Sequence, residues 1–245
     1  MIRVVFLLLA LSTLIFGAQT PVVPTMNLSL SAPDTPQQLV SSLNVLVVLT
    51  LLFLAPSMVL VMTTFTRFVI VFGFLRQALG TQQVPPSQLL VMLAMILTFF
   101  IMEPIGIKAY NNGIKPYVAQ KIGYEEAFTK TVLPFKNFMI RNTREKDLAL
   151  FLRIRKMQNP KSVADVPLSI IIPAFIISEI KTAFEIGFLL FLPFLVIDMV
   201  VASILMSMGM MMLPPVMISL PFKILVFVLI DGWDLLIGNL ISSVK

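Results

Sequence analysis

The chain has 245 residues, of which 58% are apolar and only 12% are charged, with a formal net charge of +6. A typical soluble domain carries about 25% charged residues, so this composition indicates an integral membrane protein. The chain contains no histidine and no cysteine. That absence excludes Cys and His nucleophiles, zinc sites of the usual kind, haem ligation through either residue, and disulfides.

The N-terminus has the pattern of an export signal. An early arginine precedes the short apolar run 4–15 and the small pair Gly17-Ala18, which predicts a signal peptide over residues 1–18. An uncleaved anchor is the alternative, and both interpretations send the chain that follows across the membrane. Residues 19–42 contain four prolines among serines and threonines, which predicts an extended periplasmic leader.

Residues 43–107 are predicted to form a first helical hairpin of two apolar segments. Residues 43–62 are uncharged and long enough to cross a bilayer of about 30 Å as a helix, and the second apolar run covers residues 87–102. We expect the stretch between them, residues 66–88, to be a short cytoplasmic connection, because it contains basic residues and no acid. Its two arginines are Arg67 and Arg76.

A basic block, residues 108–165, carries twelve Lys or Arg against five Asp or Glu. By the positive-inside rule its excess of basic residues favours a cytoplasmic location. That rule weakens for domains near 60 residues, so we expect a mostly helical domain on the periplasmic side. Residues 141–160 predict an amphipathic helix with apolar positions at 148, 151, 152 and 154 or 157, ending at Asn159-Pro160. Basic residues could bind nucleic acid or anionic lipid, but interleaved acids favour a solvated helix, and no nucleic-acid partner is predicted.

The C-terminal segment, residues 166–245, is strongly apolar and yet contains recurring charges. An ionised group that faces lipid costs at least about 2.5–3.5 kcal/mol at the centre of a helix. We therefore expect these side chains to find partners, and five of them to be buried and to stabilise packing between subunits. These five are Glu179, Lys181, Glu185, Asp198 and Lys223.

Two of these charges are predicted to pair. If residues 186–208 and 213–229 form an antiparallel hairpin, Asp198 and Lys223 lie at equal sequence distance from the turn and therefore at the same depth. We therefore predict that they form an ion pair, within one subunit or between neighbours. Exchanging the two charges should restore assembly that either single change destroys. The alternative is that each side chain extends separately to an interface.

The stretch MSMGMMMLPP, residues 206–215, places five methionines around one glycine before a pair of prolines. Gly209 and Pro214-Pro215 break the helices, so the stretch is predicted to be the tip of the hairpin. Methionines often fill a core, but a hairpin tip has no interior of its own. Repeated around a ring of subunits, the side chains would converge and form a deformable apolar gasket around a pore. The predicted gasket residues are Met206, Met208, Gly209, Met210, Met211 and Met212.

Two long stretches carry a family resemblance. TTFTRFVIVFGFLRQALGTQQVPPSQLL, residues 63–90, and the stretch from PAFIISEIKTAFEIGF through PFLVIDMVV and MSMGMMMLPP, residues 173–240, resemble the FliP family of flagellar type III export-gate proteins. Ser87, where Asn is common, and Ile180, where Leu is usual, are small departures. The resemblance covers nearly all of the chain after the proline-rich leader.

The resemblance implies more than the composition does. It implies an all-α membrane protein of helical hairpins that assembles as a ring or helical oligomer with FliQ and FliR, in the inner membrane at the flagellar basal body. A large part would stand on the periplasmic side, and a methionine constriction would carry over onto Met210, Met211 and Met212. Expected partners are further copies of the chain, the other flagellar export membrane proteins FlhA, FlhB and FliO, membrane lipid, and the unfolded flagellar subunits that pass through.

Other classes of function remain as alternatives. A subunit of a virulence-type injectisome export gate is the nearest, and a secondary transporter would explain charges inside the membrane but would predict inverted repeats that the sequence does not display. A hydrolase would need a nucleophile and a base, and Ser178 and Glu179 point apart on a helix. We expect no enzyme activity and no cofactor, since the sequence has no P-loop motif.

Overall fold

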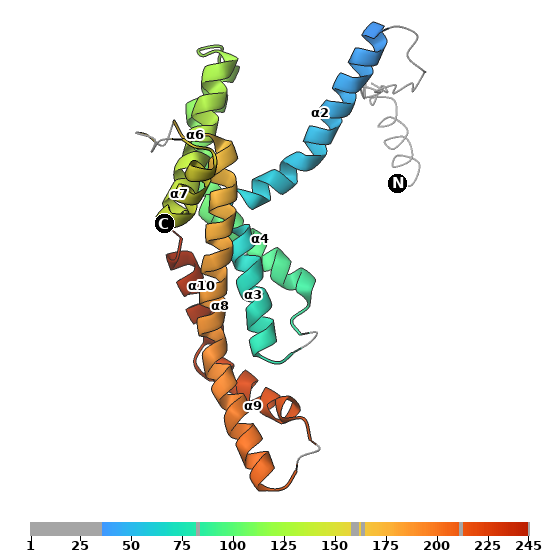
Figure 1. The fold of residues 1–245 in the computed structure, drawn as a ribbon, viewed down its shortest axis with the longest axis vertical. Helices are drawn as coiled ribbons and strands as arrows, with labels where there is room; N and C mark the ends of the chain where they lie inside the picture. Colours follow the sequence, from blue (N-terminus) through green and yellow to red (C-terminus); the bar gives the residue numbers. More distant parts are fainter. Residues whose placement is uncertain (1–35, 82–83, 158–161, 163–164, 211–212, 245) are drawn as a thin grey trace, which may run out of the picture. The chain divides into compact units, whose positions relative to one another are not determined.

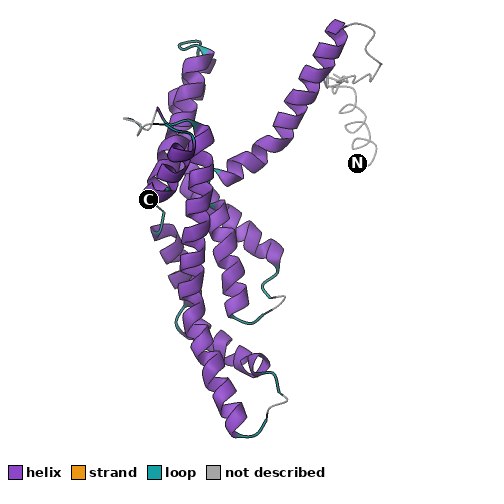
Figure 2. Ribbon diagram, in the orientation of Figure 1, coloured by secondary structure: helices purple, strands orange, loops and turns teal. Residues whose placement is uncertain are grey.

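The computed structural model describes residues 36–81, 84–157, 162, 165–210 and 213–244. Within these ranges every regular element is a helix and none is a strand (Figure 2), which confirms the predicted all-α class. The predicted signal peptide lies outside the described residues, as does most of the predicted leader. The remainder of the leader is helical, because the first described helix, α2, begins at Pro36 and ends at Val61.

The chain divides into two units, Met1–Leu49 and Thr50–Lys245. The first unit contributes only the beginning of α2 to the described residues, and the side chains described there are largely exposed. All contacts discussed below lie within the second unit. Its remaining elements (Figure 1) are α3 (Phe65–Ala78), α4 (Ser87–Ala109), the π-helix η1 (Tyr110–Ile114), α5 (Lys115–Val118), α6 (Tyr124–Asn142), α7 (Glu145–Ile154), α8 (Leu168–Ser207), α9 (Pro215–Leu229) and α10 (Gly232–Ser242).

Two continuous helical stretches among the described residues are long and apolar enough to cross a membrane. They are Ser87–Val118, which joins α4, η1 and α5, and the 40-residue α8, Leu168–Ser207. The pair α9 and α10 passes the same test together but is bent by 66° at its break, so it forms either a broken span or a re-entrant loop. The composition prediction of a membrane protein with several spans is therefore confirmed.

The segment predicted as a short connection is instead the central helix of the core. Residues 65–78 form α3, which packs along α8. Four of its apolar side chains recur at the spacing of one helix face and are fully buried: Phe68, Val71, Phe72 and Leu75. Basic residues without acids predicted a loop, whereas this 3–4 spacing of large apolar residues indicates a helix with one buried face.

Close packing of α3 on α8 depends on one glycine. A Cβ atom on Gly187 of α8 would lie 2.4 Å from Cδ2 of Phe74 on α3, well inside van der Waals contact. The aromatic ring of Phe74 therefore occupies the space that a side chain at position 187 would take. The same ring makes an edge-to-face contact with Phe184, with 5.2 Å between ring centroids.

A second core lies where α6 and α7 pack against the beginning of α8. Phe138 and Met139 of α6, Leu152 of α7 and Phe175 of α8 are buried there, and Phe138 meets Phe175 edge to face. The predicted amphipathic helix over residues 141–160 is only partly present. The backbone is extended at Thr143, where α6 gives way to α7.

Helix α7 also ends earlier than predicted. Lys156 adopts a positive φ of 52°, and the amides of Lys156 and Met157 donate to the carbonyls of Arg153 and Leu152. This is the Schellman pattern of a helix C-terminus. The helix ends at Ile154, five residues before the predicted stop. That stop, Asn159-Pro160, lies outside the described residues.

Candidate functional site

The first part of the candidate site is the methionine tip, defined as Met206, Met208, Gly209 and Met210 at the end of α8. Gly209 has a φ of 75°, its amide donates to the carbonyl of Met206, and the amide of Met210 donates to that of Leu205. This Schellman motif ends the helix where the sequence predicts a turn. The next two predicted gasket residues, Met211 and Met212, lie outside the described residues.

The methionines of the tip do not fill a core of their own chain. Met206 is 58% exposed, Met208 62% and Met210 42%, and a Cβ atom on Gly209 would meet nothing within 4 Å. The alternative that these side chains are interior packing is therefore wrong for the described members of the tip in this chain. Their apolar surface is available to another surface.

The predicted ion pair lies between the tip and the core. Lys223 of α9 donates from Nζ to Oδ2 of Asp198 on α8 at 2.6 Å, which confirms the pair within a single chain. The ammonium also donates to the carbonyl of Ala78, the last residue of α3, at 3.0 Å, and the hydroxyl of Ser219 donates to the other oxygen of Asp198. One buried lysine therefore ties three helices together, and it satisfies a carbonyl at a helix C-terminus, where a cation is favoured.

Glu179 is fully buried and pairs with Arg67 of α3. The guanidinium is bidentate: Nε donates to Oε2 at 2.8 Å and Nη2 to Oε1. Its Nη1 donates to the carbonyl and the hydroxyl of Ser243, each at 2.8 Å. This arginine is therefore buried and neutralised in the folded chain, whereas the sequence pattern predicts a short connection there.

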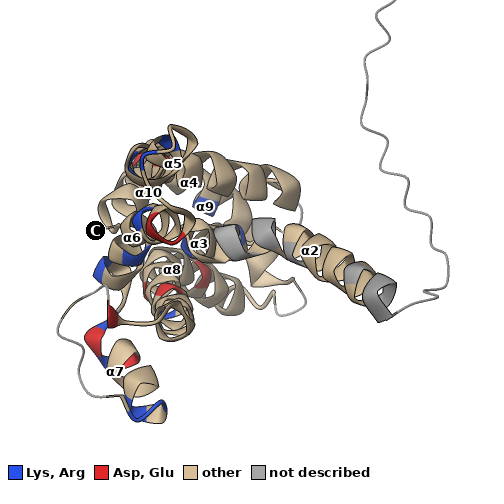
Figure 3. Cartoon of the chain, turned by 90° about the horizontal axis from the view of Figure 1, so that it is seen from above, with Lys and Arg blue, Asp and Glu red and all other residues tan. Residues whose placement is uncertain are grey.

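Two further ion pairs join the beginning of α7 to α8, and Figure 3 colours the positions of the charged residues on both helices. The buried carboxylate of Asp147 accepts from Lys181 and, at 2.9 Å, from the hydroxyl of Ser178. That hydroxyl in turn accepts the amide of Arg144 at 3.0 Å, and the Arg144 side chain pairs with Glu185. The hydroxyl that a hydrolase would need is therefore engaged with Asp147 and not with Glu179.

Two of these charged groups, Asp147 and Arg144, lie outside the candidate spans and have shifted pKa values. Burial acts to raise the pKa of Asp147, but hydrogen bonds from Lys181 and Ser178 outweigh it and hold the pKa below its ordinary value of 3.8. The hydrogen bond to Glu185 raises the pKa of Arg144. Both groups are therefore held in their charged forms at neutral pH.

The structure divides the five predicted buried charges into two classes. Glu179 and Lys223 are buried, and Asp198 is partly buried. Lys181 and Glu185 are 51% and 63% exposed, so their predicted burial is wrong for the chain by itself. Lys181 and Glu185 lie two and six residues beyond Glu179, and both pair with residues of the α7 segment while the ends of their long side chains stay exposed.

Sequence reasoning missed the partners Arg67, Arg144 and Asp147. One signal was present for the last two: Ser178, Lys181 and Glu185 recur at the 3–4 spacing of a single face of α8. A polar stripe on an otherwise apolar helix predicts a polar neighbour, and the first turn of α7 supplies it. No local signal pointed to Arg67, which is 112 residues from Glu179.

Comparison with known proteins assigns the chain to a family. The model of the FliP family matches residues 48–240. The flagellar biosynthetic protein FliP of Bacillus subtilis is 52% identical over 216 residues, which cover 88% of this chain and 98% of that protein. The protein of the same name from Caulobacter vibrioides is 54% identical over 80% of this chain and 73% of its own length. The one from Pectobacterium carotovorum is 47% identical over 92% of this chain and 86% of its own length. A family match across most of the chain and relatives at about half identity establish that the chain belongs to the FliP family.

Proposed function

We propose that the chain is a pore-forming subunit of the flagellar type III export gate, and that its methionine tip, with Met211 and Met212, seals the closed channel. The name of its relatives, flagellar biosynthetic protein FliP, supports the flagellar role. Unfolded flagellar proteins would pass through the pore. The chain would act passively, and other components would supply the energy.

The observation that carries the proposal is the exposure of the tip. Met206, Met208 and Met210 project from the end of α8 without cover from their own chain. Exposed apolar surface is stabilised when another apolar surface covers it, and copies of the same tip arranged around an axis offer such a surface. Methionine suits a seal that must deform around varied chains, because it is unbranched, flexible and polarizable.

The irregular backbone of the tip argues against a lipid environment. Residues 208–210, 213 and 214 are not helical, so some of their backbone groups lack partners within a helix. In the hydrocarbon region, non-helical backbone is tolerated only where it is buried in protein or lines a water-filled cavity. A turn between two strongly apolar helices therefore fits a position at a protein-lined passage.

The ion pairs supply the rigidity that a seal requires. Asp198 and Lys223 hold α8 against α9 and tie both to the end of α3. A tip that several copies bring to one axis must keep its position relative to the core, and a satisfied buried pair restrains it. Exposed charges such as Lys181 and Glu185 would then contribute to packing between subunits, a role that stays a prediction.

The proposed assembly is a homo-oligomer with FliQ and FliR, adjacent to FlhA, FlhB and FliO in the inner membrane at the flagellar basal body. The basic block, residues 108–165, would stand on the periplasmic side. An injectisome export gate is a related alternative, but the curated relatives quoted above all carry flagellar names.

Replacement of Met210, Met211 and Met212 by alanine tests the proposal. We expect the complex to assemble normally and the membrane to become leaky to small ions, measured as conductance in planar bilayers and as loss of membrane potential in cells. The matched control replaces Met92, Met157 and Met199, which are exposed and lie outside the stretch 206–217, and should leave conductance unchanged. An assembled complex whose conductance does not rise in the tip variant would refute the seal.

A further inference from the structure

Helix α4 leaves one face without cover from its own chain. Four large apolar side chains there, Met92, Ile96, Phe99 and Ile107, are 64%, 61%, 68% and 51% exposed, and Glu103, which is also exposed, lies in line with them. These five positions recur at intervals of three or four residues, which places them on a single side of a helix. We call this set the outer face of α4. The buried residues of α4 lie away from it.

Glu103 is the one charged member of the outer face, and it borders an apolar cavity. The cavity has a volume of about 1000 Å³, and its walls include Leu52 and Leu60 of α2, Phe99 of α4 and Phe135 of α6. The described residues that line it include no cation. Among the described residues, Glu103 also takes part in none of the ion pairs. The carboxylate therefore stands beside an apolar surface without a counter-ion from its own chain.

The residue after Glu103 adds a second acceptor. Pro104 lies inside α4 and has no amide hydrogen, so the carbonyl of Phe100, four residues earlier, lacks its usual donor. Phe100 is 64% exposed and lines the same cavity. A lysine or arginine side chain has several N–H groups and can satisfy a carboxylate and a carbonyl together. Lys223 makes this combination elsewhere in the chain.

A partner that covers the outer face has to neutralise the carboxylate. Burial of an ionised carboxylate among apolar groups is strongly unfavourable unless a cation pairs with it. Every window of about 20 residues that could cross a bilayer along Ser87–Val118 contains Glu103, so lipid is a poor cover as well. Charge complementarity therefore specifies an apolar partner helix that carries a lysine or an arginine opposite Glu103.

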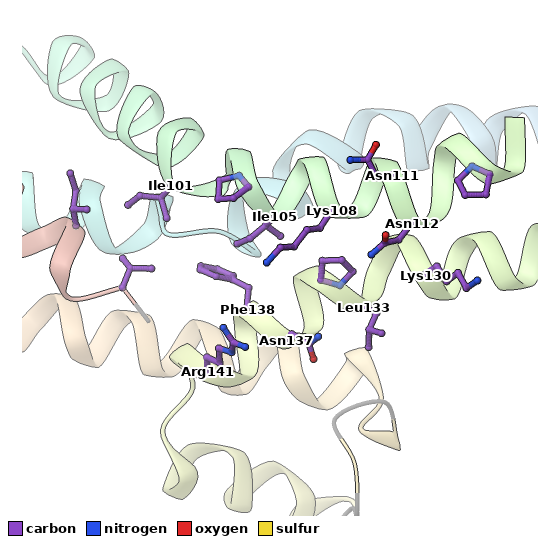
Figure 4. Close-up of a pocket in the computed structure, with 15 residues that line it drawn as sticks. Ile101, Ile105, Lys108, Asn111, Asn112, Lys130, Leu133, Asn137, Phe138 and Arg141 are labelled. Atoms are coloured by element: carbon purple, nitrogen blue, oxygen red, sulfur yellow. The ribbon is translucent and has the colours of Figure 1, made fainter. Parts of the chain in front are cut away.

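The chain itself does not supply such a helix. Helix α2, which contributes to the cavity, contains no charged residue. Lys108 of α4 lines a separate cavity between α4 and α6 and does not line the one beside Glu103 (Figure 4). The lysines of α8 and α9, Lys181 and Lys223, are already paired with carboxylates of the chain.

A second copy of the chain fits no better. Its helices α8 and α9 carry the same two lysines, each already paired. Two copies inserted into one membrane in the same direction would bring α4 against α4 in parallel, so that Glu103 would face Glu103. Like charges opposed across an interface repel. The missing cation therefore points to a different protein.

We propose that the outer face of α4 is the docking surface for an apolar helix of a different membrane protein, and that a lysine or arginine of that helix pairs with Glu103 and with the carbonyl of Phe100. The large apolar side chains on both sides of Glu103 pack against the partner, and the single ion pair sets its register. The proposal rests on the membrane class of the chain alone. The surface shares no residue with the methionine tip, so a failed seal would leave it standing.

The test uses the full-length protein reconstituted in phosphatidylcholine vesicles. Because the chain contains no cysteine, Gln88→Cys gives a unique site for a fluorophore one turn before the outer face. The probes are labelled synthetic Leu/Ala helices of about 24 residues that carry a single lysine near the middle or nearer to either end, and the same helices with glutamine or glutamate instead. Binding is measured by energy transfer. We expect lysine at one of these depths to bind about tenfold more tightly than glutamine, and glutamate to bind most weakly.

Replacement of the carboxylate tests its role directly. Glu103→Gln should abolish the preference for the lysine probe over the glutamine probe, whereas Glu103→Asp should keep most of it. The matched control, Glu145→Gln, removes an exposed carboxylate of α7 and should keep the full preference. The comparison of the three probes on the protein with its native Glu103 decides the proposal even where a variant fails to fold.

Photo-crosslinking in the native membrane identifies the occupant. With a photoreactive phenylalanine analogue at position 99, we expect adducts to map to an apolar segment of another protein that contains a lysine or an arginine, and to be lost in Glu103→Lys. Equal binding of the lysine and glutamine probes would overturn the proposal, and so would an unchanged preference in Glu103→Gln. Adducts that map to a second copy of this chain, or to lipid alone, would overturn it as well.

Discussion

Lys223 and Asp198 form an ion pair of 2.6 Å in which the two partners are unequally buried: the lysine side chain is 2% exposed and the aspartate 28%. The ammonium has one further acceptor, the carbonyl of Ala78, and the carboxylate one further donor, Ser219. The chain itself encloses the ammonium but leaves part of the carboxylate exposed. Removal of the aspartate therefore has a different consequence from removal of the lysine.

We expect Asp198→Ala to destabilise the protein more than Lys223→Ala does. The first change leaves a buried ammonium without a counter-ion, a situation that costs about 3–5 kcal/mol. The second leaves a partly exposed carboxylate that still accepts from Ser219, with a cost of about 1–3 kcal/mol. Thermal unfolding of the detergent-solubilised protein measures both, and the reverse order would contradict the observed burial.

The charge exchange Asp198→Lys/Lys223→Asp should restore only part of the lost stability. An aspartate at position 223 would face the carbonyl of Ala78, which accepts from the native lysine, and two acceptors repel. We expect the double variant to assemble better than either single variant and worse than the wild type. Size-exclusion chromatography of the extracted complex measures this, and absence of any rescue would contradict a direct pair.

Arg67 and Glu179 are expected to be interdependent. Arg67→Ala leaves Glu179 buried and uncompensated, which should lower the free energy of unfolding by about 3–5 kcal/mol. The apolar double variant Arg67→Met/Glu179→Leu should be markedly more stable than Arg67→Ala, because no charge stays buried. A double-mutant cycle with Arg67→Met and Glu179→Leu as its single changes checks the coupling by chemical unfolding, and simple additivity of these two changes would refute it.

The Asp147 cluster makes stability depend on pH. The pKa of this carboxyl in the folded protein lies below its ordinary value of 3.8, so its stabilising contribution is fully present above that value. It is lost as the pH falls through the folded-state pKa. We expect Asp147→Asn to be less stable than the wild type at pH 7 by about 1–2 kcal/mol, discounted for the exposed partner Lys181. The difference in melting temperature between the two proteins should stay constant from pH 7 down to about pH 4 and should shrink only as the pH falls below 3.8.

Gly187→Ala should disrupt the packing of α3 on α8. The added methyl group would lie 2.4 Å from the ring of Phe74, and overpacking of this kind costs about 1–3 kcal/mol. Truncation of the ring in Gly187→Ala/Phe74→Ala should relieve the clash and recover part of that loss. The control is Gly73→Ala in α3, where a Cβ atom meets nothing within 4 Å, and it should be neutral or slightly stabilising.

The prediction of the Asp198–Lys223 pair succeeded for a simple reason. Both residues lie in two helices joined by a short turn, and a hairpin converts equal sequence distance from the turn into equal depth. The helix stop at Gly209 was predictable in the same way, because glycine tolerates the positive φ that a Schellman motif needs. In both cases the information was local.

The position of α3 was predictable in part. The spacing of Phe68, Val71, Phe72 and Leu75 marks a helix with one buried face, although the positive charge of its arginines suggested a loop at the membrane surface. The residues close to α3 in the sequence do not indicate which helix covers that face. The partner, α8, begins about 90 residues after the end of α3, and nothing near α3 specified which acidic residue of α8 would face Arg67.

The sequence by itself determined the all-α membrane class, the apolar hairpin, its methionine-rich turn and the ion pair within it, because composition, helix period and turn residues act over short distances. Only the tertiary structure decided that Arg67 neutralises Glu179 and that the α7 segment supplies Arg144 and Asp147. A buried charge must have a partner, but desolvation specifies only that the partner exists. Which residue fills the role depends on how distant helices pack.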